Sequence, residues 1–182
     1  MRIASIIVAI VLLIGIVVIF VAIGDRNELV QERLAISNQW RVVDGVLQNR
    51  ADLAPSLVDA AAARNNIDQG ILNEVMEARA AVASAQTPQE RIQANGRLDT
   101  ALSRLLVAAE SNPQLKSDEN FLHVQDDLST VENRIAVERR KYNEDVQRYN
   151  TDIELFPKNI AAAMFGFHRN DAYFKTDPGG AP

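Results

Sequence analysis

The chain has 182 residues, a formal net charge of −5 and no cysteine. The absence of cysteine excludes disulfides, thiolate metal sites and cysteine nucleophiles. An acidic chain without a clustered basic surface gives no support to a nucleic-acid partner. The length suits one domain with an appendage.

The first apolar segment, residues 3–23, contains no charged side chain. As a helix it would be about 31 Å long, which matches a hydrocarbon core of about 30 Å. We therefore predict a transmembrane helix within residues 1–24, with Ile3 and Ile23 at the ends of the apolar run and Gly15 inside it. The alternative is a cleaved signal peptide, but its apolar part would be shorter.

The cations that flank this segment indicate its orientation. The α-amino group and Arg2 precede the segment, whereas Arg26, Arg33 and Arg41 follow it. Because Lys and Arg close to a membrane helix favour the cytoplasmic side, the count favours a cytoplasmic C-terminal domain.

Residues 25–157 carry the hydrophobic pattern of helices and no strand pattern. Apolar residues recur at steps of three and four, over four segments at residues 27–63, 67–84, 88–111 and 118–156. The predicted fold class is all-α. We expect the N-terminal transmembrane helix to continue into an antiparallel four-helix bundle with long first and last helices.

Local signals mark the expected ends of these helices. A capping box with proline at the first helical position is formed by residues 87–90, TPQE. Ser117 is a candidate N-cap of the last long helix, and Pro157 should end that helix. Pro55 lies inside the first pattern, where a proline costs about 3 kcal/mol and kinks or restarts a helix. Asp52 is a candidate cap for such a restart.

No constellation of side chains predicts catalysis. The two histidines, His123 and His168, are far apart in the sequence and have no nearby acidic cluster with metal-ligand spacing. None of the eight glycines belongs to a dinucleotide-binding or phosphate-binding motif. We therefore expect no enzyme activity and no metal or other cofactor, and we identify no small-molecule substrate.

Two tyrosine-asparagine pairs, Tyr142-Asn143 and Tyr149-Asn150, are separated by seven residues. This spacing places both pairs on one helix face, with their polar groups directed at one neighbouring helix. We expect structural layers in which buried Tyr and Asn satisfy each other, and the alternative is a ligand site. The same structural interpretation applies to Arg50, Asp52, Pro55 and Asn133.

Residues 158–182 form a C-terminal tail that contains four aromatic residues, Phe165, Phe167, Tyr173 and Phe174. These rings either dock on the bundle itself or contact membrane lipid or a second subunit. Helix lengths added alternately up and down bring the end of the last long helix back to membrane level, which favours contact with the membrane interface. The last residues, 177–182, are expected to be disordered.

A series of short motifs follows the hydrophobic segment in a fixed order. The motifs are RADLAPSLV at 50–58, EV at 74–75, AR at 78–79, NPQLK at 112–116, ENF at 119–121, ENRI at 132–135, YN at 142–143 and 149–150, FP at 156–157, FGF at 165–167 and YF at 173–174. Over nearly its whole length the chain thereby resembles the LemA family of bacterial membrane proteins. It departs from the family at Ser56, where Asn is usual, and at Asn65 and Asn66, where a His is frequent, so a ligand role for the latter region is weakened.

The resemblance implies a membrane-anchored antiparallel helical bundle of the bacterial inner membrane, without known enzymatic activity. One family member is needed for making a membrane organelle, which favours a protein that self-associates and organises or shapes the membrane. The expected partners are then membrane lipid and further copies of the chain. The alternative is a membrane-tethered binding or sensory module that binds a partner or ligand through its bundle.

Overall fold

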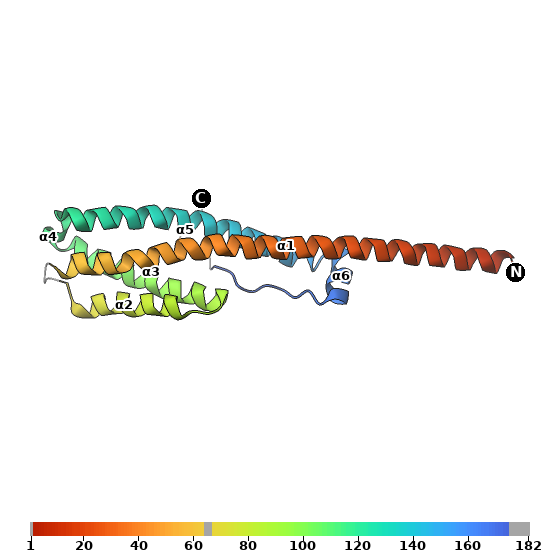
Figure 1. Ribbon diagram of the computed structural model, residues 1–182, viewed down its shortest axis with the longest axis horizontal. Coiled ribbons are helices and arrows are strands. Elements are labelled where there is room, and N and C mark those ends of the chain that lie inside the picture. Colours follow the sequence, from red (N-terminus) through yellow and green to blue (C-terminus); the bar gives the residue numbers. More distant parts are fainter. Residues whose placement is uncertain (1, 64–66, 175–182) are drawn as a thin grey trace. The chain divides into compact units, whose positions relative to one another are not determined.

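The computed structural model describes residues 2–63 and 67–174, with side chains at all of these positions except 2–9, 11 and 14. Over these residues the chain is all-helical, which confirms the predicted fold class. The helices are α1 Arg2–Ala62, α2 Gln69–Ser84, α3 Pro88–Glu110, α4 Pro113–Lys116, α5 Glu119–Asp152 and α6 Lys158–Phe165 (Figure 1).

The chain divides into two compact units. Unit 1 comprises Met1–Asn38 and Glu144–Asp171, and so contains the first part of α1, the end of α5 and the whole of α6. Unit 2 comprises Gln39–Asn143 and Ala172–Pro182, and contains α2, α3 and α4 with the remaining parts of α1 and α5.

Unit 2 is a helical bundle with one hydrophobic core. Burying a Val, Leu, Ile or Phe side chain contributes about 1.5–3 kcal/mol, so apolar residues at helical spacing bring the helices together. Figure 1 shows α2 and α3 side by side within this unit. All five helical segments contribute to the core, which includes Leu57, Val75, Leu98, Leu105, Leu115, Phe121 and Leu128.

Helix α1 is continuous through Pro55, so the expected restart at Asp52 is wrong. Proline has no N–H group, which leaves the carbonyl of Ala51, four residues earlier, without its helical donor. The Nε of Arg79 in α2 donates to this carbonyl at 3.1 Å. A side chain from a neighbouring helix therefore supplies the missing donor, and α1 continues to Ala62.

The capping box of α3 is confirmed, whereas the N-cap of α5 differs from the prediction. The Glu90 N–H donates to Thr87 Oγ1 at 3.2 Å, and the Thr87 N–H donates to the Glu90 carboxylate at 3.1 Å. At α5 the Phe121 N–H donates to Asp118 Oδ1 at 3.0 Å. Asp118 is the cap because the one-turn helix α4 uses Ser117 as its own C-cap.

Helix α5 ends at Asp152, four residues before the end expected from the pattern, and α6 follows it. Gly166 closes α6 with a φ of 70°, a backbone conformation that favours glycine. The Phe167 N–H then donates to the Ala162 carbonyl at 3.0 Å. Residues 175–182, including the end expected to be disordered, lie outside the described residues.

None of the helices, taken over the residues described here, combines the length and the apolar character needed to cross a bilayer. The transmembrane helix expected at residues 3–23 is therefore not confirmed. The side chain of Ile3 lies outside the described residues, whereas Gly15 and Ile23 are described and exposed on α1.

Candidate functional site

Arg50 is a fully buried cation in unit 2. Its Nη1 donates to Asp99 of α3 and to Glu132 of α5, each at 2.9 Å. Its Nη2 donates to the backbone carbonyl of Asn95 at 2.9 Å and to the Oδ1 of the same residue at 3.1 Å. A buried charge is tolerated only when it is paired in this way. The guanidinium group therefore connects α1, α3 and α5 and fixes which of their faces meet.

Asn143 and Asn150 bind the backbone of the tail, whereas the spacing suggested a neighbouring helix as their partner. In unit 2 the Nδ2 of Asn143 donates to the Phe174 carbonyl at 2.8 Å, and the Phe174 N–H donates to its Oδ1 at 3.0 Å. In unit 1 Asn150 makes the same two bonds with Asn170, at 2.7 and 2.8 Å. Each asparagine amide thus makes two hydrogen bonds to one residue of non-helical backbone, as a neighbouring β-strand would do.

The two tyrosines also contact the tail. Tyr142 packs against Phe174 with ring centroids 5.8 Å apart and against Trp40 at 5.4 Å, and both contacts are edge-to-face. In unit 1 the Tyr149 hydroxyl donates to the carbonyl of His168 at 2.8 Å. Burial raises the pKa of this hydroxyl, so it remains a donor at neutral pH. Each Tyr-Asn pair therefore provides one aromatic side chain and one amide for the tail.

The four aromatic residues of the tail have different surroundings. Phe174 is buried, and Tyr173 is half-buried. In unit 1 the guanidinium of Arg26 lies 5.5 Å from the centroid of Phe165, and that of Arg33 lies 5.7 Å from the centroid of Phe167. These are cation–π contacts between α1 and the tail. The remaining predicted motif residues, Asp52 and Asn133, are exposed and do not join these contacts.

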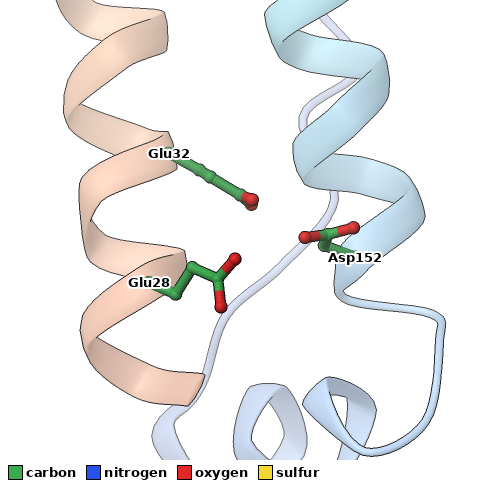
Figure 2. Close-up of side chains that lie close together, drawn as sticks. All are labelled: Glu28, Glu32 and Asp152. Atoms are coloured by element: carbon green, nitrogen blue, oxygen red, sulfur yellow. The ribbon is translucent and has the colours of Figure 1, made fainter. Parts of the chain in front are cut away.

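An acidic cluster that the sequence analysis missed lies in unit 1 (Figure 2). Glu28 and Glu32 of α1 and Asp152 of α5 each place a carboxylate oxygen within 4.8 Å of the others. Lys158, the first residue of α6, is the cation of this cluster. Its Nζ lies 2.7 Å from Glu28 and 3.9 Å from Glu32, and it also donates to Asp152. The cluster therefore ties three helices of unit 1 together.

Three carboxylates at this spacing are ligands that a hard divalent cation accepts. In this chain the ammonium group of Lys158 already lies among them and supplies the positive charge. The geometry is that of an internal ion-pair network, and it does not call for a metal. What the cluster does chemically is to hold the start of α6 against α1.

The carboxyl groups of the cluster differ in proton affinity. Burial raises the pKa of Glu32 to about 7, and its hydrogen bond with Asp152 adds to the rise. Burial acts in the same direction on Asp152, but hydrogen bonds from Lys158 and Glu32 outweigh it and lower the pKa of Asp152. Hydrogen bonds to Asp152 and Glu28 likewise outweigh burial and raise the pKa of Lys158. Between the lowered pKa of Asp152 and the raised pKa of Glu32, Glu32 therefore holds a proton while Asp152 is ionised beside Lys158.

Most of the chain matches a known protein family. The model of the LemA family matches residues 39–181, a range that includes Arg50, both Tyr-Asn pairs and the tail. This chain belongs to the LemA family. Of the acidic cluster, Glu28 and Glu32 precede the residues that the family model matches.

Individual relatives carry two different names. Magnetosome protein MamQ 2 of Paramagnetospirillum magneticum is 36% identical over 87 residues, which are 48% of this chain and 32% of that protein. MamQ of Magnetospirillum gryphiswaldense is 33% identical over a stretch of the same length and coverage. Protein LemA of Metamycoplasma hominis is 23% identical over 157 residues, 86% of this chain and 71% of that protein. The chain thus spans about a third of the length of the magnetosome relatives it matches.

The raised pKa of Glu32 predicts a pH-dependent stability. Between its ordinary pKa of 4.5 and its folded value of about 7, the folded state binds more protons than the unfolded state. The free energy of unfolding should therefore fall as the pH rises through this range, by roughly 1–3 kcal/mol because solvent partly screens the site. Glu32→Gln should abolish this fall. Denaturant unfolding at several pH values between about 5 and about 8 measures how the free energy of unfolding depends on pH in the full wild-type chain and in Glu32→Gln.

Glu28→Gln is the matched control, because it changes the other glutamate of α1 in the same cluster and leaves Glu32 in place. This variant should keep the fall in stability. A wild-type stability that is flat over the pH range, or an unchanged slope in Glu32→Gln, would contradict the assignment.

Proposed function

We propose that this protein is a membrane-anchored structural protein of the LemA type, which self-associates and organises or shapes the bacterial inner membrane. One observation carries the anchoring. In the apolar part of α1, nearly all described side chains are exposed, and Phe20 is 72% exposed. A helix that is apolar on all sides needs apolar surroundings, because exposure of so much contiguous apolar surface to water is unfavourable. The exposed large residues are Ile10, Leu12, Leu13, Ile16, Val17, Val18, Ile19, Phe20, Val21 and Ile23.

The amino-acid sequence supports the same proposal over the whole segment. Residues 3–23 lack any charged side chain, and their helical length of about 31 Å suits a bilayer core. Arg26, Arg33 and Arg41 follow the segment and outnumber the cations before it. We therefore place the bundle on the cytoplasmic side of the membrane, with one crossing.

A structural role is supported by the contacts of the buried Arg50 and the partly buried Lys158. Both terminal nitrogens of the buried Arg50 guanidinium donate to Asp99, Glu132 or Asn95, and Lys158 lies among three carboxylates. These contacts hold helices of each unit together. The relatives named magnetosome proteins belong, by that name, to an organelle. By analogy we assign this chain to the organisation of a membrane structure, with lipid and further copies of the chain as its partners.

A second candidate function, a binding or sensory module, is favoured by one cavity in unit 2. The cavity has a volume of about 600 Å³ and lies between α3, α5 and the tail. Its lining includes Arg97, Asp99, Arg139 and Tyr173, a polar set that suits a small polar ligand.

Charged substitutions in the apolar segment test the anchoring. Leu13→Arg combined with Val17→Arg places two cations on one exposed side of α1, and each cation costs about 2.5–3.5 kcal/mol at the centre of a membrane helix. The wild-type chain should stay in the membrane pellet after alkaline extraction, whereas most of the double variant should be released. Val107→Arg combined with Val137→Arg, at exposed apolar positions of unit 2, is the control and should stay in the pellet. Release of the wild-type chain would contradict anchoring.

Self-association is tested by the mass of the full chain purified in mild detergent. A structural protein should form a species of more than two copies at fixed stoichiometry, because organising a membrane requires repeated contacts between subunits. Light scattering coupled to chromatography measures this mass. A monomer or dimer at all concentrations would contradict self-association and favour the binding module.

A further inference from the structure

A patch of exposed apolar side chains lies at α6 and the turn before it. Phe156 is 79% exposed and Met164 is 65% exposed, which is unusual for large apolar residues of a soluble domain. The opposite side of α6 is buried through Ala161 and Ala162. The α6 patch consists of Leu155, Phe156, Ile160, Met164 and Phe165.

Contacts within unit 1 place α6 beside the end of the apolar segment of α1. Lys158 at the start of α6 lies 2.7 Å from Glu28, and Phe165 at its end lies under the guanidinium of Arg26. Arg26 follows Ile23, the last residue of the apolar segment, by three residues, about 4.5 Å along α1. The only charged residue of the sequence between them is Asp25. The α6 patch is therefore nearly continuous with the exposed apolar surface of α1.

We propose that the α6 patch inserts into the head-group region of the bilayer and forms a second membrane contact beside the spanning helix. This inference rests on the proposed function, because it needs α1 to enter the membrane up to Ile23. A short helix that lies in the interface buries one apolar side in the lipid and keeps its other side on the protein. Helix α6 has these two sides, because its large apolar side chains are exposed and Ala161 and Ala162 are buried against the protein.

The charges around the patch indicate that the contact is apolar and not electrostatic. Lys158 is enclosed by Glu28, Glu32 and Asp152. Arg169 is paired with Glu154 at 2.8 Å and with Asp171 at 3.0 Å. Because these cations are engaged within the protein, insertion of the patch should not require anionic lipids. The partner is therefore a lipid surface in general, including one made only of zwitterionic lipid.

Nitroxide labels on single cysteines can measure the position of the patch, because the natural chain has no cysteine. The labels are attached to Phe156→Cys and Met164→Cys in the patch, to Phe20→Cys in the proposed span and to Val107→Cys on unit 2 as the aqueous control. The full chain is reconstituted in phosphatidylcholine vesicles, and circular dichroism verifies that each variant is folded. Collision of the label with oxygen, which concentrates in lipid, is compared with collision with a water-soluble nickel complex.

The labels at residues 156 and 164 should collide severalfold more with oxygen than with nickel, at a shallower depth than the label at residue 20. The label at residue 107 should show the opposite preference. Nickel access at 156 and 164 with a lipid-embedded label at 20 would overturn this inference and leave the anchoring intact. Nickel access at 20 would overturn the proposed function as well. Labels at 156 and 164 that are shielded from both reagents and broadened by a neighbouring label would assign the patch to a second copy and overturn the lipid contact.

Discussion

Backbone outside helices and sheets needs hydrogen-bond partners when it is packed against protein, and two asparagines of α5 provide them for the tail. Asn143 and Asn150 each bind both the N–H and the carbonyl of one tail residue. An unsatisfied buried backbone group costs about 1–3 kcal/mol, so the tail could not pack closely without such partners. Asparagine suits this role because its short amide offers a donor and an acceptor in one plane.

Several other features depend on this tethered tail. In unit 2 it brings Phe174 to Trp40 and Tyr142, which completes a cluster of three aromatic rings. In unit 1 the bond between Asn150 and Asn170 holds the segment that follows α6. The ion pair of Lys158 with Glu28 holds the first residue of α6 against α1. Because both ends of α6 are held, the helix has a fixed orientation within unit 1. The proposed lipid contact depends on this orientation, since it determines which side chains of α6 are exposed.

Patterns of local origin could be predicted from the sequence. The longer helices of unit 2, α1, α2, α3 and α5, follow from apolar residues at steps of three and four, and the α3 capping box is encoded within four consecutive residues. Helix α6 was missed because eight residues are too short for a periodic pattern, although Gly166 is a recognisable end signal. The N-cap of α5 was placed one residue early because the one-turn helix α4 was not anticipated.

The partners of the polar residues could not be predicted, because spacing defines a helix face and not the group that meets it. The spacing of the Tyr-Asn pairs predicts a shared helix face, but their hydrogen-bond partners in the tail lie 19 to 31 residues further along the chain. The same holds for Glu32 and Asp152, which come from α1 and α5. At Pro55 the helix continues although proline usually kinks or ends a helix, because Arg79 of another helix donates a hydrogen bond to the carbonyl that proline leaves without a donor.

Asparagine side chains of α5 hold the tail, and amide hydrogen exchange of the full chain tests this tethering most directly. The N–H groups of Asn170 and Phe174 donate to Asn150 and Asn143, so both should exchange much more slowly than in an unstructured peptide. Asn150→Leu should accelerate exchange at residue 170 by about tenfold or more, since a protecting bond worth about 1.4 kcal/mol corresponds to a factor of ten. Asn133→Leu, at an exposed position of α5, should leave it unchanged. Exchange of both amides at the unstructured rate in the wild-type chain would contradict the account.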